Sequence, residues 1–358
     1  MAGSSLIASN HSRQVFTVGP SSYAVRDVLD AAQFRGEVQP VWEEFLRLVA
    51  CDERAANEDR EADDAAIDTA VQTFRYDHDL ITAEETERWL AERDLTLSDF
   101  SDYFTRHYWG EAMGDGLKGE EIDYFSAAAE LRDVFLAELV FSGEFVRMAT
   151  RFAWRLTAAV DGNTAPSEEE IEAQLQLLIA RLKPGALPSW TAQMGRDADW
   201  INQMSHLEAA FRMVNDSVLS PQARKREVGT LRLQLTTFDL EVLEVDSQDA
   251  AREALLCVRE DGMKMEEVAT EGRYPFHREQ LVLDDITPEL QQQFLSATPG
   301  LVLEPMEVDG AHRLCQVVAK HEPDPEDPAV QRRVEKRLLD RHFDEAMTQH
   351  VQWNLSPS

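Results

Sequence analysis

The sequence predicts an α+β protein, and three observations support this class. Apolar residues recur at helical spacing through most of residues 23–234, above all in residues 122–160, whereas residues 236–245 alternate apolar and polar side chains as a half-buried strand does. Helix and strand signals then follow one another up to residue 319, and an amphipathic helix closes the chain. We therefore expect a mainly helical domain, a small α+β domain with a short antiparallel sheet, and a C-terminal helix that packs back on the helical domain.

The first 22 residues are polar and contain no apolar signal region, so we expect them to be disordered. The helical domain is expected to span residues 23–234. Within it, Thr82 and Glu85 form a capping-box pattern that predicts the start of a helix. The same pattern recurs at Ser167, which we interpret as a weak internal echo of the earlier segment.

The α+β domain is expected to span residues 235–322. Its first strand, residues 236–245, is followed by a helix that Ser247 caps and by a helical turn near residue 265. The remaining elements expected are a strand at residues 280–283, a helix from Thr287 to Ala297, and strands at residues 301–308 and 312–319 joined by a turn at Asp309 and Gly310.

Residues 323–358 are expected to form a proline-containing connector and the C-terminal helix. This helix carries the densest basic cluster of the chain, between Arg332 and Arg341. A basic amphipathic helix can bind a membrane surface or a nucleic acid. Because residues 37–130 are strongly acidic, we expect instead that it packs on the N-terminal helices.

The composition limits the classes of partner. The chain has 67 acidic and 35 basic residues and a formal net charge of −32. We expect neither nucleic acid nor membrane partners, because both attract proteins largely through Lys and Arg. A neutral or basic peptide fits this charge, although acidity also serves solubility or adaptation to salt.

The three cysteines, Cys51, Cys257 and Cys315, lie far apart in the sequence. An odd number without a Cys-x-x-Cys pair predicts neither a disulfide framework nor a metal or redox motif. No stretch has the length and apolarity of a transmembrane helix. We therefore expect a cytoplasmic protein that uses no cofactor and no metal.

Several short motifs in the α+β segment resemble the parvulin family of peptidyl-prolyl isomerases. These motifs are Ala250-Ala251 with Ala254-Leu255, Glu266 to Ala269, Thr287 to Leu290, Gly300 to Pro305, and Gly310-Ala311-His312. A helical domain before this module and a helix after it are similar to the SurA and PpiC type of chaperone, and Phe74 to Leu80 with the helix pair that follows is similar to the helical domain of that type. The resemblance covers residues 25–352 and is strongest in the last 120.

The resemblance implies that His312 matches the histidine of the family's last strand. The position of the first-strand histidine falls on Glu241 or, with a slip of one residue, on Leu240 or Val242, so this histidine is replaced. Glu241 and His312 are candidate catalytic residues that could pair as acid and base across the sheet. The alternative is that both are structural, since paired charges on a sheet usually are.

The resemblance also implies a slot for the peptide. Ile286 and Leu290 align with the residues that line the family's pocket and would make the slot aliphatic. Tyr274, Phe276 and His277 stand in a shortened loop and either line a peptide groove or cover the core. With the loop shortened and two of the diagnostic side chains replaced, we expect a parvulin-like scaffold whose isomerase activity is weak or absent.

The leading functional hypothesis is a peptide-binding chaperone or accessory protein. Its client would be an extended, unfolded or precursor peptide, as in ribosomal peptide maturation systems, with a modifying enzyme as a further partner. Two alternatives remain open: an active prolyl isomerase that uses His312 and Glu241, and a non-enzymatic scaffold for partner proteins.

Overall fold

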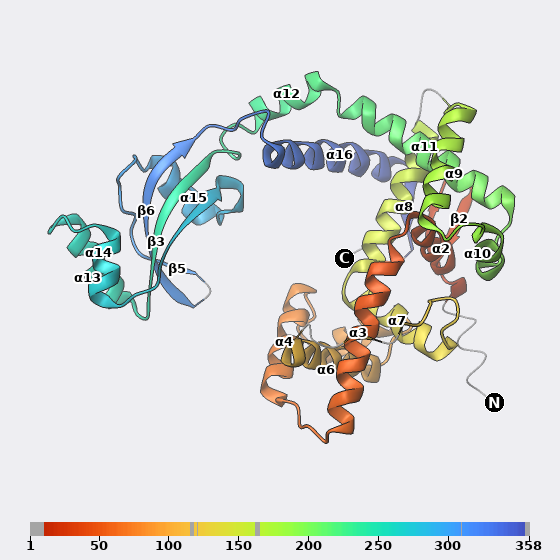
Figure 1. Ribbon diagram of the computed structural model, residues 1–358, viewed down its shortest axis with the longest axis horizontal. Coiled ribbons are helices and arrows are strands. Elements are labelled where there is room, and N and C mark those ends of the chain that lie inside the picture. The colour runs from red at the N-terminus through yellow and green to blue at the C-terminus, as the bar shows by residue number, and fades with distance from the viewer. Residues whose placement is uncertain (1–10, 115–117, 120, 162–164, 309, 355–358) are drawn as a thin grey trace. The chain divides into compact units, whose positions relative to one another are not determined.

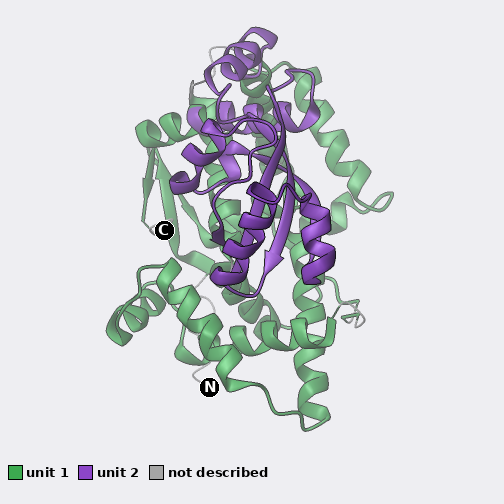
Figure 2. Cartoon of the chain, turned by 90° about the vertical axis from the view of Figure 1, so that its left-hand side faces the viewer, with its two compact units in different colours: residues 1–216, 342–358 green, residues 217–341 purple. Residues whose placement is uncertain are grey.

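The computed structural model describes residues 11–114, 118, 119, 121–161, 165–308 and 310–354. The chain divides into two compact units, coloured separately in Figure 2: unit 1 consists of Met1–Asp216 with His342–Ser358, and unit 2 of Ser217–Arg341. Each unit combines helices with a small antiparallel sheet, which confirms the α+β class. Within the described ranges, none of the helices has the length and apolarity needed to cross a bilayer.

Unit 1 is mostly helical (Figure 1). Two helices, α11 and α16, run across the boundary between the units. The helices of unit 1 are α2 (Val25–Arg35), α3 (Val38–Asn57), α4 (Asp64–Asp77), α5 (Ala83–Ala91), α6 (Leu97–Met113), α7 (Ala129–Phe141), α8 (Glu144–Asp161), α9 (Glu168–Arg181), α10 (Leu187–Met194), most of α11 (Ala198–Val218) and the last turns of α16 (Pro328–His350).

The sheet of unit 1 corrects the expectation of a disordered N-terminus. β1 (Gln14–Val18) pairs antiparallel with β2 (Ser21–Ala24) on one side and with β7 (Val351–Trp353) on the other. Residues 14–22 are therefore strand and turn, while residues 1–10 lie outside the described residues. Phe16 pairs with Trp353, which lies at the other end of the sequence, so a local sequence pattern cannot indicate this pairing.

Aromatic side chains fill the core of unit 1. Trp42 on α3 is fully buried, and its ring centroid lies 4.9 Å from that of Phe135 on α7. The indole N–H of Trp42 donates to the carbonyl of Ile122 at 2.7 Å. A second aromatic cluster joins α4, α5, α6 and α7 and consists of Phe74, Trp89, Phe100, Phe104 and Phe141. Each such side chain contributes about 1.5–3 kcal/mol on burial, so the clusters fix how these helices pack.

The helix boundaries follow local chemistry. The hydroxyl of Thr82 accepts a hydrogen bond from the Glu85 amide at 3.2 Å, and the Glu85 carboxylate accepts one from the Thr82 amide at 2.8 Å. Ser167 begins α9 with the same capping box. The apolar stretch at helical spacing over residues 122–160 contains two helices, α7 and α8, because Gly143 between them adopts a left-handed conformation with φ of 75°.

Unit 2 contains a four-stranded antiparallel sheet with the order β4-β3-β6-β5. Helix α15 packs on the face that carries Phe238, and helices α13 and α14 pack on the face that carries Leu243. The elements are α12 (Pro221–Thr230), β3 (Thr237–Val245), α13 (Gln248–Arg259), α14 (Met265–Gly272), β4 (Phe276–Val282), the short helix η2 (Leu283–Asp285), α15 (Pro288–Ser296), β5 (Met306–Val308), β6 (Ala311–His321) and the first half of α16.

The predicted order of elements in this segment is confirmed, apart from the short helix η2, which was not predicted, and with two main differences in extent. The strand expected at residues 280–283 begins earlier, at Phe276, and the strand expected at residues 301–308 is confined to Met306–Val308. Of the predicted turn, Asp309 lies outside the described residues.

The first half of α16 packs on α12 inside unit 2. Val334 and Leu338 share a small core with Val228 and Leu231, which is why the contacts divide the chain near residue 217. We expected this helix to pack on the N-terminal helices because residues 37–130 are acidic. Three of its basic residues instead form ion pairs with acids of unit 2, which lie closer to the helix. The ion pairs are Arg333 with Asp285, Arg337 with Asp284, and Arg341 with Glu227.

Phe343 holds the last turns of α16 in unit 1. It is fully buried, and its ring stacks on that of Trp154 with centroids 4.9 Å apart. We expect Phe343→Ala to lower the free energy of unfolding by about 3–5 kcal/mol, and the exposed control Gln349→Ala on the same helix to change it by less than about 0.5 kcal/mol. Urea unfolding followed by tryptophan fluorescence measures both values, and equal stability of the two variants would contradict this packing.

Candidate functional site

Glu241 and His312, the predicted catalytic pair, lie apart on the sheet of unit 2. In the register of β3 and β6, Glu241 is opposite Gln316, whereas His312 is opposite Val245. The two positions are separated by four residues along β3, about 13 Å at the rise of a strand. The expected acid–base contact is therefore absent. Glu241 instead accepts hydrogen bonds from Nε and Nη2 of Arg278 on β4, at 3.0 and 2.8 Å.

Ile286 and Leu290, the predicted slot, lie on the other face of this sheet. Ile286 is buried in the cluster that contains Phe238 and Phe294, and Leu290 is half-buried against the same cluster. Successive side chains of a strand point to opposite faces, so Phe238 and Glu241 face away from each other. The slot residues thus belong to a packed core, and the sheet separates them from the predicted catalytic carboxylate.

Tyr274, Phe276 and His277 also do not form one groove. Tyr274 and Phe276 pack against the cluster of Leu243 beneath α13 and α14. Phe276 and His277 belong to β4 and not to a loop, so they point to opposite faces. On its face, His277 Nε2 lies 3.6 Å from the carboxylate of Glu279. The predicted peptide-binding set is therefore divided between the two faces.

An open polar cavity borders Glu241. It measures about 1130 Å³ when the open space at its mouth is counted. Its lining comes from α13, from α14 and the segment before it, from residues 300–302, and from β3, β4 and β6. Two of the cations that line it are engaged: Arg278 donates to Glu241, and Arg259 Nη1 lies 2.6 Å from a carboxylate oxygen of Glu304. His312 is not among the lining residues. The cavity is therefore lined by only one of the two predicted catalytic residues, Glu241, and the carboxylate of Glu241 is already paired with an arginine.

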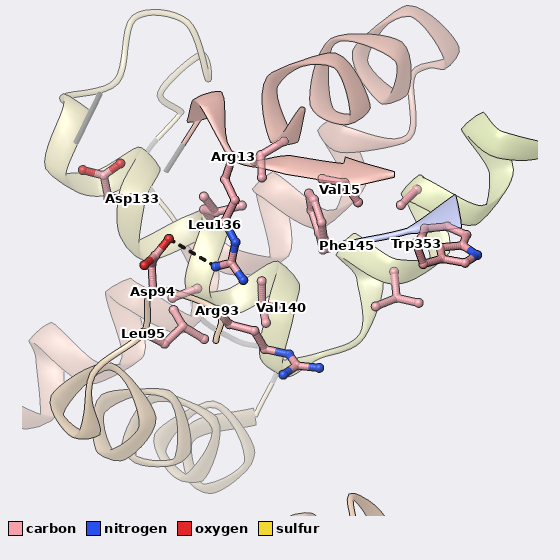
Figure 3. A pocket seen from close by; sticks show the side chains of 14 residues that line it. Arg13, Val15, Arg93, Asp94, Leu95, Asp133, Leu136, Val140, Phe145 and Trp353 are labelled. Atoms are coloured by element: carbon pink, nitrogen blue, oxygen red, sulfur yellow. Dashed lines mark hydrogen bonds and ion pairs between the residues drawn. The ribbon is translucent and has the colours of Figure 1, made fainter. Parts of the chain in front are cut away.

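A different cavity, the apolar pocket, lies in unit 1 (Figure 3). It measures about 700 Å³ when the open space at its mouth is counted. Its walls come from β1, β7, α2, α7 and α8, and from the turn that follows α5. The apolar lining residues are Val15, Val25, Leu95, Leu136, Ala137, Val140, Phe145, Val146, Ala149 and Trp353.

Charged side chains of both signs line the apolar pocket. They are Arg13, Arg93, Asp94 and Asp133, two cations and two anions. Arg13 Nη1 lies 3.2 Å from Asp94 Oδ2, and Figure 3 shows Arg13 pointing toward this carboxylate. Burial raises the pKa of Asp133 above its ordinary value. The pocket therefore combines an apolar wall with hydrogen-bond donors and acceptors.

A buried ionic group fixes α7, the helix that supplies much of the apolar wall. Glu138 on α7 is only 4% exposed, and its two carboxylate oxygens lie 3.0 Å from Nη2 of Arg106 and 2.6 Å from Nε2 of His107, both on α6. A buried carboxylate is costly unless it is paired in this way, so the group sets the rotation of α7. It leaves Leu136 and Val140 to line the pocket.

The arrangement can bury an apolar side chain and hydrogen-bond the backbone of the chain that carries it. Sequence reasoning missed this pocket because its residues run from Arg13 to Trp353 and share no motif. Two signals were available: the apolar residues at 15, 16 and 18, and the second half of α7, where residues 134–141 are apolar except for Glu138. Among the described residues, no three or more His, Cys, Asp or Glu side chains are grouped as a metal site would require.

No model of a protein family matches the chain, and no curated protein matches it. Several solved structures resemble it. The PrsA peptidylprolyl isomerase of Bacillus cereus has 12% identity and a TM-score of 0.36, and the match covers 61% of this chain and 85% of that one. PrsA of Bacillus anthracis has 12% identity and a TM-score of 0.34, with coverage of 56% and 96%. A SurA-like chaperone of Campylobacter jejuni has 9% identity and a TM-score of 0.19, with coverage of 59% and 88%.

Cys315 on β6 lies in the core beneath α15, and burial raises the pKa of its thiol to about 12. Only the thiolate is alkylated, and burial leaves very little of the Cys315 thiol ionised at about pH 8. We expect Cys315 to resist iodoacetamide in the folded protein and to react once urea unfolds it. The half-buried Cys257 serves as the control and should react in both states. Peptide mass spectrometry measures the labelling, and rapid alkylation of folded Cys315 would contradict its burial.

Proposed function

We propose that this protein binds extended peptide segments as a chaperone or accessory protein. The apolar pocket of unit 1 is the observation that carries the proposal. Its floor includes Val15, Leu136 and Phe145, each no more than 9% exposed, and charged groups surround it. Apolar walls with a few polar groups are typical of sites that take one side chain of a peptide and orient its backbone.

Energetics favours a client that makes several contacts. Full burial of one apolar side chain contributes about 1.5–3 kcal/mol. A dissociation constant of about 1 mM already needs about 4 kcal/mol, so one such contact binds more weakly than that. A chain that presents several apolar residues would bind more tightly and still dissociate quickly. Weak contacts of this kind suit the capture and release of unfolded segments.

The charge of the protein indicates the kind of client. With a net charge of −32, the surface attracts neutral or basic peptides more than acidic ones. We propose an unfolded or precursor peptide as the client, a cytoplasmic setting, and a peptide-modifying enzyme as a further partner. A precursor peptide encoded beside this protein, and retained by it in a pull-down, would support this part of the proposal, whereas an acidic client would contradict it.

The divided site in unit 2 argues against isomerase catalysis. Glu241 and His312 make no contact, and Ile286 is packed on the opposite face. A prolyl isomerase must place an apolar grip and its polar groups around one peptide bond, whose rotation has a barrier of about 18–20 kcal/mol. The described residues do not bring the predicted groups together in this way.

Filling the apolar pocket should weaken client binding. In Val146→Trp, the indole ring fills the part of the apolar pocket beside Phe145. We therefore expect a labelled peptide rich in Leu, Phe and Lys to bind at least about tenfold more weakly. The matched control is Val160→Trp, on the same helix but 57% exposed, which should bind as the original chain does. Fluorescence anisotropy gives the affinities, and equal affinity of the two variants would contradict the proposal.

The isomerase alternative is tested with a short Xaa-Pro peptide in a protease-free assay. We expect a rate no higher than the uncatalysed one, and no change in His312→Ala. A strong rate that His312→Ala abolishes would establish the enzyme and overturn the chaperone-only account. If the protein shows neither client binding nor isomerase activity, the scaffold alternative is left.

A further inference from the structure

A second apolar cavity lies elsewhere in unit 1, among three consecutive helices. We name it the α9–α11 pocket; it measures about 710 Å³ including its mouth. Its walls are mainly aliphatic and contain no aromatic ring. The lining residues are Ile171, Glu172, Leu175, Leu187, Pro188, Thr191, Ala198, Ile201, Asn202 and Ser205.

Ser205 gives this pocket an unsatisfied hydrogen-bonding group. The residue is 1% exposed, and its hydroxyl oxygen has no hydrogen-bond partner. Other hydroxyls of the region are satisfied: Ser189 donates to the carbonyl of Ala186 at 2.8 Å, and Thr191 donates to that of Leu187 at 3.1 Å. A buried hydroxyl without a partner is unfavourable, so this one is suited to bond a group that enters the pocket.

Acidic residues of α9 line the pocket and precede it in the helix. Glu172 is its one charged lining residue, and the preceding turn of α9 consists of exposed glutamates at positions 168, 169 and 170. Glu170 caps the helix by accepting a hydrogen bond from the Ser167 amide, and Arg212 is the cation that lies near it. The glutamates at the start of α9 favour a cation beside the apolar group in the pocket.

We propose that the α9–α11 pocket binds an aliphatic side chain that has a Lys or Arg as its neighbour in an extended peptide. A backbone carbonyl of the peptide accepts a hydrogen bond from Ser205 Oγ, and the basic neighbour lies over the glutamates of α9. The inference rests on the proposed function, to which it adds a second contact and a preference for basic clients. Two pockets on one unit would raise the affinity for a client long enough to occupy both.

The test compares a labelled peptide in which each Leu is flanked by Lys with one in which each Leu is flanked by Glu. We expect the Lys-flanked peptide to bind at least about tenfold more tightly, and Glu172→Gln to reduce this preference. Ser205→Ala should weaken binding about fivefold, while Ser189→Ala on the neighbouring helix should not. The thermal midpoint of Ser205→Ala should stay unchanged or rise, because the variant removes an unpaired buried group. Equal binding by Ser205→Ala, or equal affinity for both peptides, would overturn the inference.

A filling variant separates this inference from the proposed function. Ala198→Trp should fill the α9–α11 pocket, with the exposed Ala180→Trp on α9 as its matched control. Loss of binding in both Ala198→Trp and Val146→Trp supports two contacts. Loss in Val146→Trp alone keeps the proposed function and overturns this inference, whereas loss in Ala198→Trp alone supports the inference and removes the apolar pocket from the proposed function.

Discussion

The pairing of β1 with β7 is the constraint on which the apolar pocket depends. It brings Phe16 and Trp353 together, with ring centroids 5.1 Å apart, and so places the two ends of the described chain in one sheet. Val15 on one strand and Trp353 on the other then form a wall of the pocket (Figure 3). Phe343 and Trp154 anchor the helix that leads into β7. The shape of the pocket therefore depends on how this last helix packs.

Much of the fold could be predicted because its signals are local. The capping box at Thr82, the alternation that gives β3, and the serine that caps α13 all act within a few residues, and each forms as expected. The N-terminal strand could not be predicted in this way, since the residues that pair with it come at the other end of the chain. The break in the apolar stretch at Gly143 shows a further limit: periodicity continues across it while the backbone turns.

The site was harder to predict than the fold, for a reason visible in unit 2. Side chains of a strand alternate between faces, and the register between β3 and β6 decides which residues meet across the sheet. Glu241 and His312 share a face, yet the register separates them, while Ile286 packs on the opposite face. The two apolar pockets of unit 1 depend on helix packing, and their residues resemble ordinary core residues in the sequence. Only the unpaired hydroxyl of Ser205 and the charges beside the apolar walls set them apart.

Photo-crosslinking tests the central claim most directly, because it reports where an extended peptide lies on the folded protein. A photoreactive side chain introduced at position 146, in the apolar pocket, is compared with the same group at position 160 of the same helix and at position 277 on β4. The account predicts that a bound Lys- and Leu-rich peptide is captured from position 146 and not from the other two. Capture mainly from position 277, with none from 146, would place peptide binding on the sheet of unit 2 and contradict the account.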